Sequence, residues 1–258
     1  MENRIRRTLA NKSEKLISIY FTAGYPNLND TIGIAENLQN AGADLIEIGI
    51  PFSDPSADGP VIQAANKVAL DNGMSLKLLF TQLKDLRKRV DIPVLLMGYL
   101  NPVMQFGIEE FCKSCAEVGI DGCILPDLPL AEYKNEYESY FKHYNLEIIW
   151  LITPQTTEER IRAYDENSNS FLYALSSSST TGNTADSFSE DSINYFNKLK
   201  MLNLKNPFFI GFGISNKNTL KQAFDYAKGA IIGTAFIKSL NNANGLNKTD
   251  EFINLLKK

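Results

Sequence analysis

Three carboxyl groups in residues 45–60 are the side chains best suited to chemistry. Glu47 stands in an apolar run over 46–50, which is typical of a buried parallel strand. Asp54 and Asp58 follow in a segment rich in Pro, Ser and Gly, which is typical of a loop. Apolar surroundings raise the pKa of a carboxyl group towards the range that suits a general acid or base. The spacing therefore predicts a pocket that Glu47 and Asp58 face from a strand end and the loop after it.

Each acid also has a structural interpretation. A buried Glu47 can be satisfied by a backbone amide or a basic partner. Asp54 before Pro55 is typical of a turn, and Asp58 can cap a helix that has Pro60 in its first turn. The residues alone leave these alternatives open.

Eight short apolar segments, each followed by a helical pattern, are expected to position these acids. The strands are predicted over 16–22, 45–50, 93–97, 122–125, 146–152, 171–175, 207–210 and 230–232. Eight such units in 258 residues favour an α/β fold with parallel strands closed into a (β/α)8 TIM barrel. No composition shift marks a linker, so residues 1–258 are predicted to form a single domain.

The helices that frame the strands have recognisable ends. They are predicted over 2–12, 31–40, 61–70, 76–90 and 108–118, with a short extra helix after the eighth strand and a final one over 249–257. Asp30 and Ser75 are expected to cap the helices that follow them.

The ends of the later strands carry glycines with a second chemical meaning. Gly182, Gly213 and Gly233 follow the sixth, seventh and eighth strands, and Thr234 opens the short extra helix. Barrels often bind phosphate with the last two loops and such a helix, because glycine lets backbone N–H groups approach an anion. The pattern favours a phosphate site, although glycines also serve in turns.

Composition excludes several classes of protein. A net charge of −4 and the absence of a dense Lys/Arg tract argue against a nucleic-acid-binding protein. No apolar run approaches the roughly 18 residues needed to span a membrane, and the first residues lack an apolar signal core. Three cysteines fit a reducing compartment, so the chain is expected to be cytoplasmic.

Metal chemistry is not expected. Cys112 and Cys115 form a single C-x-x-C without a second pair at metal-ligand spacing, and Cys123 lies in a predicted strand, so all three are interpreted as packing residues. His143 is the single histidine and lies on a helix, which excludes a histidine-based triad.

Residues 46–60 resemble the signature of the tryptophan synthase alpha subunit. The match combines three carboxylates with Gly and Pro at fixed places, and it continues over 21–26, 97–102, 127–129, 181–182, 211–215 and 229–235. The resemblance implies a (β/α)8 barrel and a carbon–carbon lyase of tryptophan biosynthesis. Such an enzyme cleaves indole-3-glycerol phosphate to indole and glyceraldehyde 3-phosphate.

The resemblance also assigns roles. Glu47 would protonate the indole ring at C3 and then take the proton of the side-chain hydroxyl, whereas an ionised Asp58 would bind the indole N–H. Tyr173 would lie near Glu47, and Thr181 near Asp58. The substrate would contact Tyr20, Tyr99, Ile124, Tyr173, Thr181 and Phe212, and its phosphate would be held at Gly182, Gly213, Gly233 and Thr234.

A partner subunit follows from the same resemblance. Alpha subunits bind a beta subunit that carries pyridoxal phosphate, usually as an α2β2 heterotetramer, and indole passes between them. Pro51, Asp54, Asn101 and Pro102 match positions that face this partner. No cofactor is expected in this chain itself.

One departure from the family and two alternatives remain. Ser179 stands where the family usually has glycine in the loop after the sixth strand, which predicts altered loop closure. A catalytically weak subunit that mainly binds and activates its partner is one alternative. The other is a barrel enzyme for a different phosphorylated substrate, such as a sugar-phosphate epimerase, which the motif at 46–60 disfavours.

Overall fold

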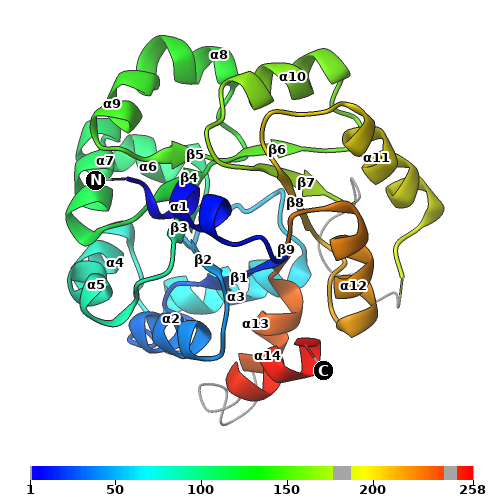
Figure 1. Cartoon of the computed structure of the whole chain (residues 1–258). Helices are drawn as coiled ribbons and strands as arrows, with labels where there is room; N and C mark the ends of the chain where they lie inside the picture. Colours follow the sequence, from blue (N-terminus) through cyan, green and yellow to red (C-terminus); the bar gives the residue numbers. More distant parts are fainter. Residues whose placement is uncertain (1, 177–186, 241–248, 258) are drawn as a thin grey trace.

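The computed structural model describes residues 2–176, 187–240 and 249–257. Within them a parallel sheet curls into a barrel surrounded by helices, in the strand order β5-β4-β3-β2-β1-β9-β8-β7-β6 (Figure 1). The strands are β1 (Leu16–Thr22), β2 (Leu45–Gly49), β3 (Val94–Met97), β4 (Gly122–Ile124), β5 (Glu147–Ile148), β6 (Trp150–Ile152), β7 (Leu172–Leu175), β8 (Phe208–Gly211) and β9 (Gly229–Ile232). The TIM barrel predicted from the alternation of strands and helices is confirmed.

The two end strands of the sheet are halves of one predicted strand, 146–152. β5 pairs with β4 and β6 pairs with β7, so the chain changes its pairing partner at Ile149. The Ile149 side chain is buried inside the barrel, and its N–H donates to the Cys123 carbonyl at 2.9 Å. The eight predicted strands therefore all form, and this interruption gives the sheet its two ends.

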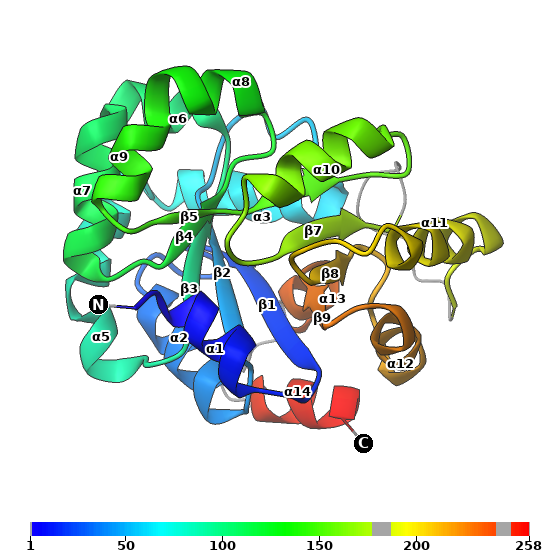
Figure 2. The same cartoon turned by 45° about the horizontal axis from the view of Figure 1, so that its top comes forward.

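Helices pack around the outside of the barrel (Figures 1 and 2). In chain order they are α1 (Arg4–Asn11), α2 (Thr31–Asn40), α3 (Pro60–Asp71), α4 (Leu76–Gln82), the 3₁₀ turn η1 (Leu83–Asp85), α5 (Leu86–Arg89), α6 (Leu100–Phe106), α7 (Ile108–Val118), α8 (Leu130–Glu132), the π-helical turn η2 (Tyr133–Tyr137), α9 (Glu138–His143), α10 (Glu158–Glu166), α11 (Glu190–Met201), α12 (Lys217–Tyr226), α13 (Thr234–Leu240) and α14 (Thr249–Lys257). The extra short helix predicted after the last strand is α13.

Two helix predictions need correction. The continuous helix predicted over 76–90 is interrupted by η1, whose tighter winding keeps Leu83 and Leu86 fully buried. Between the predicted strand 93–97 and the predicted helix 108–118, where no helix was predicted, the chain forms α6. Pro102 is tolerated there because it lies within the first turn, where a missing N–H costs no helical hydrogen bond.

The predicted caps differ in outcome. Ser75 caps α4, since its hydroxyl accepts the Leu78 N–H at 3.2 Å. Asp30 occupies the N-cap position of α2 but makes no capping bond. Its carboxylate instead accepts a hydrogen bond from the side-chain amide of Asn27 at 2.7 Å. The predicted position of Asp30 was therefore right, but the predicted capping hydrogen bond was wrong.

The N-terminal helix closes one end of the barrel. Ile5 of α1 packs into the barrel interior with Leu16, Phe171 and Phe209. Figure 1 shows α1 lying across this end. The amide of Asn3 fixes the helix by donating to the Asp121 carbonyl at 2.7 Å. The interior of the barrel is therefore open only at the other end, where the carboxyl ends of the strands meet.

The three cysteines and the histidine lie away from the carboxyl ends of the strands or are buried in the core. Cys112, Cys115 and Cys123 are free and buried, and His143 is exposed at the end of α9. Across the described residues, no three His, Cys, Asp or Glu side chains cluster as metal ligands would. No helix in that part of the chain is long and apolar enough to cross a membrane.

Candidate active site

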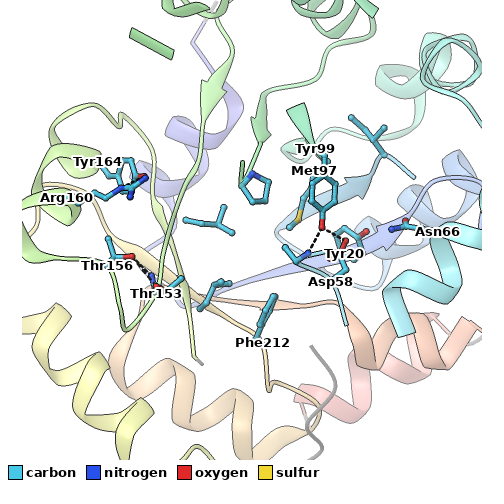
Figure 3. Close-up of a pocket in the computed structure, with 16 residues that line it drawn as sticks. Tyr20, Asp58, Asn66, Met97, Tyr99, Thr153, Thr156, Arg160, Tyr164 and Phe212 are labelled. Atoms are coloured by element: carbon cyan, nitrogen blue, oxygen red, sulfur yellow. Dashed lines mark hydrogen bonds between the residues drawn. The ribbon is translucent and has the colours of Figure 1, made fainter. Parts of the chain in front are cut away.

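A cavity of about 260 Å³ opens at the carboxyl ends of the strands (Figure 3). A smaller cavity of about 40 Å³ adjoins it, and the two share Tyr20, Asp58, Met97 and Phe212. In Figure 3, Asp58, Tyr99 and Asn66 lie on one side of the larger cavity, opposite a group of residues from β6 and α10. This is the place where the sequence predicted a pocket.

Glu47 lies in the middle of β2 with no exposed surface. The Ser18 hydroxyl on β1 donates to Glu47 Oε1 at 2.7 Å, and Oε2 has no hydrogen-bond partner among the described residues. Burial raises the pKa of Glu47 to about 7, against the lowering effect of the Ser18 hydrogen bond. A carboxyl group with this pKa holds or releases a proton near neutral pH, as a general acid and base must.

Glu47 lies just behind the cavity wall rather than on it. It is absent from the lining of both cavities, whereas Tyr20 and Tyr173 line them. Tyr20 is paired in register with Glu47. Burial raises the pKa of Tyr20 and of Tyr173, and the negative charge of Glu47 raises both further. The expected proximity of Tyr173 to Glu47 fits this arrangement.

Asp58 lines both cavities from the loop after β2. Gly59, not Asp58, is the N-cap of α3, and Pro60 begins the helix. The Asp58 carboxylate is therefore not used as a helix cap and accepts the Tyr99 hydroxyl at 3.2 Å. Burial raises the pKa of Asp58 to about 6, and the Tyr99 hydrogen bond opposes the rise. The pKa of Glu47 remains the higher of the two, so near neutral pH Asp58 ionises more completely.

Tyr99 is fixed from three sides. Its hydroxyl accepts the Ala57 N–H at 3.0 Å as it donates to Asp58, and its ring packs 5.2 Å from that of Phe52. At its back, the Leu100 N–H donates to both oxygens of Asp127, at 2.9 and 3.0 Å. The loops after β2, β3 and β4 therefore meet at the neighbouring residues Tyr99 and Leu100.

Two glycines make room for aromatic side chains of the wall. A Cβ at Gly49 would lie 2.2 Å from the Tyr20 hydroxyl, and one at Gly211 would lie 2.1 Å from the Tyr173 ring. Phe212, the next residue, has a φ of 67° and turns its ring to both cavities. Small residues on neighbouring strands thus allow large rings at the base of the cavity.

The structure describes three of the four residues predicted to hold phosphate. Gly213, Gly233 and Thr234 line the smaller cavity. Gly213 follows β8, whereas Gly233 and Thr234 lie at the start of α13. No lysine or arginine lines this cavity within the part of the chain that the structure describes. Thr181 and Gly182, with Ser179, lie outside the described residues.

One predicted contact residue lies elsewhere. Ile124 is fully buried, belongs to the interior cluster that also holds Leu95 and Ile149, and does not line either cavity. Periodicity shows that a strand residue faces inward, but not the layer of the barrel in which it lies.

The predicted partner-facing residues lie beside the cavity. Asp54 and Asn101 are exposed, Pro102 is half-buried and Pro51 is buried. They belong to the loop after β2 and the first turn of α6, the two segments that Tyr99 joins.

Several lining residues had no counterpart in the sequence predictions. Thr153, Thr156, Arg160 and Tyr164 form the far wall, where Arg160 Nε donates to the Tyr164 hydroxyl at 2.8 Å. Ser18 was also missed, although a single polar residue in the apolar run 16–21 was a signal that could have found it.

Comparison with known proteins agrees with this geometry. The family model described as tryptophan synthase alpha chain matches residues 6–257. The tryptophan synthase alpha chain of Flavobacterium johnsoniae is 55% identical over 251 residues, covering 97% of this chain and 98% of the relative. That of Christiangramia forsetii is 52% identical over 255 residues, covering 99% and 98%.

Solved structures extend the comparison to the fold. Tryptophan synthase subunit alpha from Legionella pneumophila superposes with a TM-score of 0.88 at 32% identity, covering 100% of this chain and 98% of the other. Tryptophan synthase from M. tuberculosis gives a TM-score of 0.85 at 26% identity, covering 99% and 98%. Because the family model and these relatives match almost the whole length, the chain belongs to the tryptophan synthase alpha chain family.

Proposed function

We propose that this chain is a carbon–carbon lyase that cleaves indole-3-glycerol phosphate to indole and glyceraldehyde 3-phosphate in tryptophan biosynthesis. The observation that carries the proposal is a cavity bordered by Asp58, with the buried Glu47 of higher pKa directly behind its wall, and an adjoining glycine-lined pocket. The aromatic wall suits an indole ring, and membership of the family supports the choice of substrate.

Glu47 acts as acid and then as base. Its proton goes to C3 of the indole ring, which breaks the aromaticity of the five-membered ring. The resulting Glu47 carboxylate then takes the proton of the substrate hydroxyl on the carbon next to C3. As it does so, the carbon–carbon bond breaks and the electron pair of that bond returns to the indole ring. The carboxyl group is thereby restored, which requires a pKa near the working pH, as burial provides.

Asp58 stabilises the charge that this sequence creates. Protonation at C3 places positive charge on the ring nitrogen, and an ionised carboxylate that accepts the indole N–H lowers the energy of that state. The Tyr99 hydroxyl holds the carboxylate from its other side.

The remaining contacts follow from the lining of the cavities. We assign the indole ring to Tyr20, Tyr99, Tyr173 and Phe212, with Ile124 supporting them from below. Phosphate binds backbone N–H groups at Gly213, Gly233 and Thr234. Thr181 and Gly182 complete the two sites by resemblance to the family.

A beta subunit is the proposed partner, in an α2β2 assembly that holds pyridoxal phosphate in the beta subunit. Pro51, Asp54, Asn101 and Pro102 form the proposed contact, beside the mouth of the cavity. A tryptophan synthase structure among the similar proteins supports this assignment. We place the single barrel domain, residues 1–258, in the cytoplasm, where its three buried thiols stay reduced.

The decisive experiment measures indole released from indole-3-glycerol phosphate by the full chain, alone and with a beta subunit. We expect release in both cases and a higher rate with the partner. Glu47→Gln, which removes the acid but keeps its size, should reduce the rate by about 10²-fold or more. Tight binding of the beta subunit without any indole release would replace the lyase with the alternative of an activating subunit.

A further inference from the structure

The hydroxyl of Ser18 is buried inside the barrel with one hydrogen-bond partner. Ser18 lies in β1 between Leu16 and Tyr20, and alternation along the strand turns all three side chains to the barrel interior. The residue has no exposed surface, and its Oγ donates to Glu47 Oε1 at 2.7 Å. A polar side chain at this depth is directed at the group that performs the chemistry.

This contact makes the two oxygens of Glu47 unequal. Oε1 accepts the Ser18 hydroxyl, so in the neutral carboxyl group the proton is on Oε2. Oε2 is buried, and no residue in the described ranges 2–176, 187–240 and 249–257 gives it a hydrogen bond. Buried polar atoms are rarely left unpaired, and a catalytic role is one of the reasons for which such an atom is retained. Here the unpaired atom carries the proton that the proposed reaction transfers.

We propose that Ser18 is a positioning residue for Glu47, which holds Oε1 and thereby keeps the transferable proton on Oε2. The proposal rests on the proposed lyase function. Ser18 itself lines neither cavity, so it acts on the substrate only through Glu47.

The surroundings leave Ser18 as the main polar influence on Glu47. The titratable groups beside it are Tyr20 on β1 and Tyr173 on β7, and Asp58 in the loop after β2 acts on these two tyrosines rather than on Glu47. β3 presents the apolar side chain of Leu95 in register with Glu47. Burial raises the pKa of Glu47, and the Ser18 hydrogen bond is the influence that lowers it.

The test compares Ser18→Ala with the parent chain and with Ser18→Thr, which retains a hydroxyl. In Ser18→Ala we expect kcat to fall about tenfold with KM unchanged, because Glu47 loses its fixed orientation but the cavity lining is intact. The alkaline limb of kcat/KM should move up by about one pH unit, because the hydrogen bond that favours the ionised form is lost. Ser18→Thr should restore the limb towards its original position.

Ser170→Ala is the matched control. Ser170 is 1% exposed and lines neither cavity, and its hydroxyl has no hydrogen-bond partner in the part of the chain that the structure describes. It should leave kcat and the pH profile unchanged. An unshifted alkaline limb in Ser18→Ala, or a kcat that rises, overturns the positioning role.

A second readout does not depend on turnover. Titration of ¹³C-labelled Glu side chains, with the Glu47 signal assigned by its loss in Glu47→Gln, gives the pKa of Glu47 in the parent and in Ser18→Ala. A higher pKa in Ser18→Ala supports the contact, and equal values refute it. If the parent chain released no indole, the proposed function would fail while this titration still decided whether Ser18 controls Glu47.

Discussion

At the scale of single residues, burial gives two carboxyl groups different properties. Glu47 has no exposed surface and a pKa of about 7, whereas Asp58 borders the cavity, accepts the Tyr99 hydroxyl and has a pKa of about 6. The same burial that prepares Glu47 to transfer a proton makes its ionised form costly to keep folded.

This cost predicts a stability that depends on pH. Between the ordinary pKa of 4.5 and about 7, the folded chain keeps a proton on Glu47 that the unfolded chain loses, so the free energy of unfolding falls as pH rises. Glu47→Gln should remove up to about 3 kcal/mol of this fall. Denaturant unfolding at pH 5 and pH 8 measures the free energy of unfolding at each pH. An equal fall between the two pH values in parent and variant would contradict the burial argument.

Tyr99 predicts a change at the acidic side of the activity profile. Its hydroxyl lowers the pKa of Asp58, so Tyr99→Phe should raise that pKa and move the acid limb of kcat/KM upwards by up to about one pH unit. The alkaline limb, which reports Glu47, should stay in place. A shift of both limbs would mean that the ring, not the hydroxyl, controls the site.

At the scale of elements, three loops at the barrel mouth act as one unit. Asp127 after β4 binds the first N–H of α6, the residue before α6 is Tyr99, and Tyr99 contacts Ala57 and Asp58 in the loop after β2. The proposed partner contacts Asn101 and Pro102 lie in the same first turn of α6.

A double-mutant cycle tests this unit. Asp127→Ala removes the acceptor at the start of α6 and should lower kcat about threefold to tenfold, since Tyr99 is no longer held against Asp58. In a Tyr99→Phe background the same change should have almost no further effect. Ser75→Ala, which removes the cap of a helix away from the cavity, is the control for general loss of stability. Additive effects on kcat would show that Asp127 acts by another route.

At the scale of the whole molecule, the two ends of the barrel have separate tasks. The end covered by α1 is held by Asp121, which is 3% exposed and binds Arg87 at 2.6 Å, Arg4 at 3.1 Å and the Val94 N–H at 2.9 Å. The opposite end holds the cavity. Stability and catalysis should therefore respond to different substitutions.

Asp121→Ala is the corresponding prediction. It leaves the half-buried Arg87 without its carboxylate and should lower the free energy of unfolding by about 3 kcal/mol. The value of kcat, measured well below the melting temperature, should stay within about twofold of the parent. A large loss of kcat with unchanged stability would contradict this prediction, because it would show that Asp121 acts in catalysis and not in stability.

The pattern of residues along the chain was enough to predict the strands and the main acids. β-branched and apolar runs must be buried as parallel strands, so their number and order followed from the pattern, and Glu47 inside such a run marked the site. The segment 46–60 placed Asp58 beside it, because only one loop separates the strand from the next helix.

Contacts between residues far apart in the sequence became visible once the chain was folded. Ser18 against Glu47, Asp127 against the start of α6 and the interruption of the strand at Ile149 each depend on pairing between strands, which local sequence does not encode. The layer in which a side chain lies, as for the buried Ile124, depends on the stagger of neighbouring strands. Periodicity gives the direction of a side chain, but the closure of the barrel sets its depth and its partners.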